Sequence, residues 1–237
     1  MRKSSCEGGM SMRMITMGAM LMVLGMRAGA LAASSSTEPE RIGVGNAAIE
    51  SLTGDVYAEP SKWSPLSLGT FFSEGWDQAW ASPTNGSGGA PRQGWIGAAD
   101  GVFYRLAIGT FSYAHDAGGN GNAYTGAMTL YTPLSRRLEL RYDLPMVVSS
   151  KGSTNSYNTA VGDFAITPRV ILSESQDLTQ SFGVSFRTPT GDDINGNGIA
   201  AITPGYEFWS NPWEKLVVRG GATMAIPFGH DSFAESG

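Results

Sequence analysis

Residues 136 to 145, RRLELRYDLP, alternate charged and apolar side chains almost without a break. One parity holds Arg137, Glu139, Arg141 and Asp143, and the other holds Leu138, Leu140, Tyr142 and Leu144. Because a β-strand sends successive side chains to opposite faces, this stretch predicts a strand with one ionic face and one apolar face. The apolar face would meet either a protein core or a lipid bilayer, and the ionic face either bulk water or a water-filled lumen.

From residue 101 onward the sequence reads as a series of such strands. They are predicted over residues 101–113, 122–132, 137–148, 161–172, 179–189, 200–209 and 215–227. Most of them are longer than the five or six residues usual in soluble sheets, and they match a tilted strand that crosses a bilayer. The connections after the first, third and fifth strands are long and polar, whereas the others are short. Long loops on one side and short turns on the other are typical of an outer-membrane barrel.

A secreted β-sandwich would show the same alternation of side chains. The barrel is favoured by strand length, by loop alternation and by aromatic residues near the strand ends, which are Tyr104, Tyr142, Trp209 and Trp213. A slip of strand 137–148 by one residue would turn four charges toward lipid, at a cost on the order of 10 kcal/mol. We therefore predict an all-β fold, an antiparallel up-and-down transmembrane β-barrel whose apolar face contacts outer-membrane lipid.

The odd-numbered face of these strands is predicted to line the lumen. Its ionisable residues are Arg105, Glu139, Arg141, Asp143, Asp163, Arg169, Arg187, Glu207 and Arg219. They could orient the polar groups of a small-molecule solute, or they could form a structural network that fills a narrow barrel. Seven strands are an odd number, whereas single-chain bacterial barrels have an even number, so we expect a chain cut short at its C-terminus.

The first 32 residues have the pattern of a cleaved signal peptide. Arg2, Lys3 and Arg13 precede the apolar stretch from Met14 to Met26, and small residues follow at 30–32. Export would remove four basic residues, one acidic residue and the only cysteine, Cys6, leaving 12 basic and 20 acidic residues. The predicted location is the bacterial outer membrane, and such an acidic chain lacks the basic footprint that nucleic-acid binding requires.

Residues 33–100 are predicted as a polar lead-in followed by a Trp-, Pro- and Gly-rich segment. This segment carries Trp63, Trp76, Trp80 and Trp95, and the spacing of Trp76 and Trp80 would suit one helical turn. The segment could plug the lumen or offer an aromatic surface to hydrophobic solutes. A packed or interfacial structural role is the favoured interpretation.

Three stretches resemble a known family: YTPLSRRLELRYDLPMVVSS, GDFAITPRVILSESQDLTQSFGVSFRTPTGD and PGYEFWSNPW. They are similar to outer-membrane barrels grouped as meta-pathway phenol-degradation transporters, and the resemblance covers roughly residues 60 to 230. It implies an outer-membrane protein that passes aromatic or other hydrophobic compounds, and it supplies no catalytic set. The terminal aromatic-ended strand of such barrels is missing, in keeping with the expected truncation.

Two further groups of residues are candidates for a calcium site and for a hydrolase site. Asp193, Asn195 and Asn197 have the first spacings of a calcium loop, but Pro204 stands where an EF-hand needs glutamate, so only a looser calcium site is conceivable. His115 and His230 could serve a Ser–His hydrolase, yet no G-x-S-x-G sequence accompanies them. We expect no enzymatic activity and no cofactor. The leading hypothesis is a passive channel or transporter, and the alternative is a structural or adhesive barrel with a closed lumen.

Overall fold

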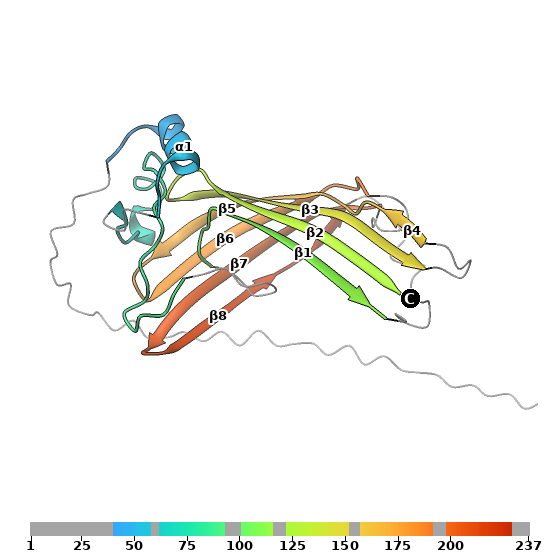
Figure 1. Ribbon diagram of the computed structural model, residues 1–237. Coiled ribbons are helices and arrows are strands. Elements are labelled where there is room, and N and C mark those ends of the chain that lie inside the picture. Colours follow the sequence, from blue (N-terminus) through green and yellow to red (C-terminus); the bar gives the residue numbers. More distant parts are fainter. Residues whose placement is uncertain are drawn as a thin grey trace, which may run out of the picture. The chain divides into compact units, whose positions relative to one another are not determined.

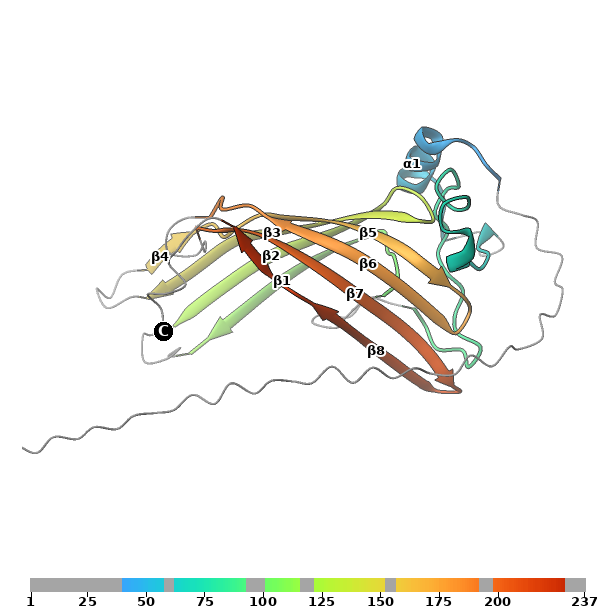
Figure 2. The same cartoon turned by 180° about the vertical axis from the view of Figure 1, so that it is seen from behind.

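The computed structural model describes residues 40–57, 62–92, 101–115, 122–151, 157–191 and 198–228. The predicted signal peptide lies outside these ranges. Within them the regular structure is predominantly β-strand, all of it within residues 106–228, with one α-helix and one short 3₁₀-helix before it. Its strands form a single curled antiparallel sheet that resembles half of a barrel (Figures 1 and 2). The all-β, barrel-like prediction is confirmed, and the described strands do not divide into the two sheets of a sandwich.

The sheet contains nine strand segments. They are β1 (Leu106–Ala114), β2 (Ala123–Pro133), β3 (Leu138–Lys151), β4 (Tyr157–Ala160), β5 (Ala165–Glu174), β6 (Leu178–Arg187), β7 (Ala200–Trp213), β8 (Leu216–Thr223) and β9 (Ile226–Phe228). The order across the sheet is β1-β2-β3-β5-β6-β7-β8. Each strand therefore pairs with its neighbour in sequence, as expected of an up-and-down barrel.

The two extra segments continue existing strands. β4 and β5 both pair with β3 in one register, and β8 and β9 do the same with β7. The break between β8 and β9 lies opposite Pro204, which accepts a hydrogen bond from the amide of Met224 but has no N–H to return. The predicted loop over 149–160 is wrong in extent, because β3 runs to Lys151 and β4 begins at Tyr157.

The two faces of the sheet differ as the alternation predicts from β2 onward. Paired side chains such as Phe182 and Tyr206 lie on the apolar face, whereas the pair Glu139 and Arg169 lies on the other, which we call the polar face. The prediction for the first strand is wrong. Leu106 and Ile108 pair with Tyr131 and Thr129, so they lie on the polar face, and Phe111 and Tyr113 lie on the apolar face.

Residues 101–105 are not part of the first strand, contrary to the prediction. Val102, Phe103 and Tyr104 are all buried in succession, which an alternating strand would not allow. Together with residues 62–92 they form what we call the cover segment. It packs in two apolar clusters on the polar face. One contains Val56, Leu66, Trp80, Phe103 and Ile171, and the other contains Ala90, Val102, Tyr104, Tyr131 and Trp209.

The α-helix α1 (Val44–Thr53) lies within the region predicted as a polar lead-in. Its buried Ser51 accepts a hydrogen bond from the Trp80 amide, which ties the helix to the cover segment. Figure 1 shows α1 and the residues that follow it at the end of the sheet where the short turns lie. Of the helices in the described ranges, none has the length and apolarity needed to cross a bilayer.

Candidate functional site

The polar face carries an ion triad, of which Glu139 and Arg169 are buried and Glu207 is partly exposed. One nitrogen of Arg169 donates to Glu139 over 2.5 Å, and the other donates to Glu207 over 2.9 Å. Glu139 is fully buried and also accepts the backbone N–H of Tyr104, which belongs to the cover segment. The register places Glu139 and Arg169 directly opposite each other on β3 and β5. The triad therefore joins three strands and the cover segment.

A glycine gives the long Arg169 side chain its room. Gly183 lies opposite Arg169 on β6, and a Cβ atom added there would come within 2.9 Å of the Arg169 Cγ. Because real Cβ atoms do not approach so closely, a larger residue would displace the arginine stem. The stem crosses over Gly183 and brings the guanidinium to Glu207 on β7.

Two further ion pairs lie on the same face in more open surroundings. Arg141 donates to Asp143 over 3.0 Å, and the Asp143 carboxylate also accepts the Thr129 hydroxyl. Arg187 and Asp163 approach to 3.8 Å near the long-loop end. The side chains of Arg141 and Arg187 are about one-third exposed, in contrast to 3% for Arg169. Arg219 lies on this face opposite Trp209.

Arg105 does not join these residues, and its predicted placement on the odd-numbered face of a strand is wrong. It precedes β1, and its guanidinium donates to the carbonyls of Ser51 and Gly54 at the end of α1. Its guanidinium carbon lies 5.6 Å from the centre of the Tyr57 ring. The alternating pattern that placed it in a strand runs through a stretch that packs as core.

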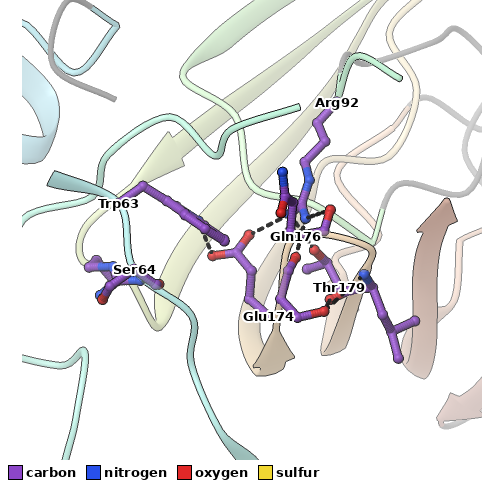
Figure 3. A network of polar contacts seen from close by, with 9 residues as sticks. Trp63, Ser64, Arg92, Glu174, Gln176 and Thr179 are labelled. Carbon is purple, nitrogen blue, oxygen red and sulfur yellow. Dashed lines mark hydrogen bonds and ion pairs between the residues drawn. The ribbon is translucent and has the colours of Figure 1, made fainter. Parts of the chain in front are cut away.

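Arg92, which sequence reasoning missed, is the most enclosed arginine of the cover segment (Figure 3). One of its nitrogens donates to the carboxylate of Glu174 over 3.1 Å and to the hydroxyl of Thr179 over 2.7 Å. The other donates to the carbonyls of Ser175 and Gln176 in the β5–β6 turn. Arg92 is a single charged residue in a Gly-rich stretch that shows no alternation, so its role could not be predicted from a periodic pattern.

Aromatic rings complete the surroundings of Arg92. The guanidinium carbon lies 4.5 Å from the Trp209 ring centre and 5.7 Å from that of Trp63. The Trp63 indole N–H donates to the second oxygen of Glu174. Burial lowers the pKa of Arg92, and the nearby Glu174 carboxylate opposes that shift. We call Trp63, Glu174, Ser175, Gln176, Thr179 and Trp209 the Arg92 cage.

The β2–β3 turn supplies two more arginines to the cover segment. Arg136 donates to the hydroxyl and the carbonyl of Ser64, and Arg137 donates to the carbonyls of Glu74 and Ser67. Burial lowers the pKa of both arginines. Arg137 donates mainly to backbone oxygens, and Arg136 also reaches the Ser64 carbonyl, so both satisfy carbonyl groups of a segment that has little regular structure.

The tryptophans of the cover segment have packed roles. Trp80 is buried against Tyr57 in an edge-on contact, and the Trp76 indole donates to the carbonyl of Phe71. Trp76 and Trp80 lie in bends and extended chain, so the predicted helical turn is wrong. Trp95 lies outside the described residues.

The predicted calcium loop and one of the two histidines are outside the part of the chain that the structure describes. Asp193, Asn195, Asn197 and His230 lie outside the described residues. His115 has Tyr113 and Asn122 as its polar partners. Within the described ranges, no cluster of three His, Cys, Asp or Glu side chains has the geometry to hold a metal ion.

The geometry divides the polar face into two levels. Toward the short turns, the cover segment and its arginines close the face, and the ion triad lies beneath residues 101–104. Toward the long loops, Arg141, Asp143 and Arg187 remain partly exposed.

Comparison with protein-family models, with curated proteins and with solved structures finds no match.

Proposed function

We propose that the chain is a bacterial outer-membrane channel or transporter that passes small solutes by passive diffusion. The observation that carries this proposal is the apolar face of the curled sheet. Phe182, Phe186 and Val218 are each about 40% exposed there, although they belong to regular strands. An apolar face of this extent on a curled antiparallel sheet is suited to contact with lipid.

Aromatic side chains at both ends of the strands support a membrane location. Phe111, Tyr113 and Tyr124 form an exposed cluster on the apolar face near the long-loop end. Trp213 is 69% exposed at the end of β7, beside the short turn to β8. Aromatic rings favour the two interfaces of a bilayer, and here they lie at opposite ends of the strands.

The charges of the polar face favour solutes without a large net charge. Arg169 faces Glu139 and Glu207, Arg141 faces Asp143, and the pairing is thus local. A lumen lined by compensated pairs attracts neither anions nor cations strongly. The family resemblance implies aromatic or other hydrophobic solutes, which agrees with such a lumen.

The proposal is tested by measuring permeation through the full-length protein reconstituted in lipid. We expect conductance in planar bilayers and swelling of liposomes in small uncharged solutes. The matched control is the same protein with its cover segment cross-linked to the sheet. A protein that inserts but stays electrically silent and tight to solutes would refute the channel.

A closed structural or adhesive barrel is the second candidate, and one observation favours it. Glu139 and Arg169 are buried beneath the cover segment, as in a barrel whose interior is filled by side chains. In that case the long loops would bind partners. The same permeation measurement separates the two candidates, because a filled barrel passes no solute.

A further inference from the structure

Arg92 reaches from the cover segment into a site whose other members come mainly from the sheet. Its side chain is 1% exposed, and that of Glu174 is 8% exposed. The carboxylate, the Thr179 hydroxyl and the two turn carbonyls accept hydrogen bonds from one guanidinium (Figure 3). Four acceptors on four different residues are more than a solvated surface arginine normally meets.

The chemistry of the Arg92 cage is selective for a guanidinium group. A planar fork can donate to a carboxylate and to carbonyls at once while its face contacts aromatic rings. The Trp209 ring centre, 4.5 Å from the guanidinium carbon, is well placed for a cation–π contact. An ammonium group has a single compact charge and could not reach all of these acceptors together.

The neighbouring contacts show what Arg92 holds in place. Ser87 donates to Asp177 through both its amide and its hydroxyl, and Gly88 donates to Asn211. Ala90, Val102 and Tyr104 pack with Trp209 on the polar face. Arg92 is the charged, buried member of the docked residues, 86–92 and 101–104, which lie over the ends of β5, β6 and β7.

We propose that the Arg92 cage is a guanidinium-binding site in which the chain's own Arg92 is the bound group, and that this contact latches residues 86–92 and 101–104 over the polar face. The latch is a property of the fold alone. Its consequence for permeation rests on the function proposed above: release of the latch uncovers the polar face and opens the path through the barrel.

The test uses a thiol on the buried part of the polar face, between Ile171 and Glu207 in the sheet. Ser181 is 1% exposed on the polar face of β6, and its hydroxyl has no hydrogen-bond partner within the described residues. Ser181→Cys in a Cys6→Ser background therefore reports exposure of this face through its rate of maleimide labelling. To this chain we add Arg92→Ala or, as the matched control, Arg41→Ala, whose side chain is 53% exposed.

We expect R92A to label about ten-fold faster or more, because charge-assisted hydrogen bonds shift an equilibrium by that factor. R41A should label at the parent rate. Methylguanidinium should fill the vacated cage and slow the labelling of R92A again, whereas methylammonium at the same concentration should not. Equal slow labelling of R92A and R41A overturns the latch, and equal rescue by both cations overturns the guanidinium site.

A second variant covers the case in which R92A does not fold. Glu174→Gln keeps the shape of the cage but removes the charge opposite Arg92, so it should also speed labelling, and an unchanged rate overturns the latch. Conductance measured on the same samples separates the two proposals. Fast labelling without conductance supports the latch and refutes transport, whereas conductance with unchanged labelling supports transport and refutes the latch.

Discussion

Replacing Arg169 by methionine should strongly destabilise the protein. The substitution keeps an apolar stem over Gly183 but removes the donors to Glu139 and Glu207. Glu139 is fully buried and would retain, among the described residues, only the Tyr104 amide as a donor. Removal of one partner from a buried ion pair costs about 3–5 kcal/mol in the free energy of unfolding. Glu207, whose side chain is 23% exposed, can turn to water, so Glu207→Gln should cost about 1 kcal/mol or less.

The assay is urea unfolding of the protein in lipid, followed by tryptophan fluorescence, for R169M, E139Q, E207Q and the R169M/E139Q double variant. The double variant should be more stable than the sum of the single losses predicts, with a coupling energy of about 2 kcal/mol. If R169M costs less than about 1 kcal/mol and shows no coupling to E139Q, water solvates the triad. The reasoning that the lumen is desolvated at this level would then be refuted.

Two further predictions use matched neighbours. Val184→Arg on the apolar face of β6 should make the free energy of folding into lipid vesicles about 2–4 kcal/mol less favourable. Ser185→Arg on the polar face should fold normally. Equal folding of the two variants would refute the assignment of the faces. A Cβ atom added at Gly101 would lie 2.6 Å from the backbone of Phe208, but one added at Gly109 meets nothing within 4 Å. Gly101→Ala should therefore lower the urea midpoint and Gly109→Ala should not, and the close approach of residue 101 to β7 would be wrong if both were neutral.

The polar face could be predicted from alternation, but its partners could not. The parity of Glu139, Arg169 and Glu207 follows from the sequence because a strand has a period of two. That Arg169 lies opposite Glu139 depends on the register of β3 and β5. Turn geometry and bulges set such a register, and alternation along one strand does not contain it.

The errors at the start of the sheet have a different cause. Val102, Tyr104, Leu106 and Ile108 continue one alternating pattern, yet the strand begins only at Leu106 and uses the opposite parity. Residues 101–104 pack with residues 62–92 of the cover segment and with the polar face, so they are apolar for a reason unrelated to strand period. The role of Arg92 depends on contacts across more than 80 residues of chain, for which a single sequence has no signal.

Under the function proposed above, the two interpretations of these charges, orienting a solute or filling the barrel, would apply to different levels of the polar face. Glu139 and Arg169 are buried and bound to the cover segment, so no solute could reach them without displacing residues 101–104. Arg141 and Arg187 are about one-third exposed toward the long loops, where polar groups of a solute could compete for their donors. We infer that the charges toward the long loops would orient a solute, while the charges toward the short turns hold the barrel closed. On this view permeation is limited by release of the cover segment, so variants of the latch should change the open fraction of the channel, and variants of Arg141 should change which solutes pass.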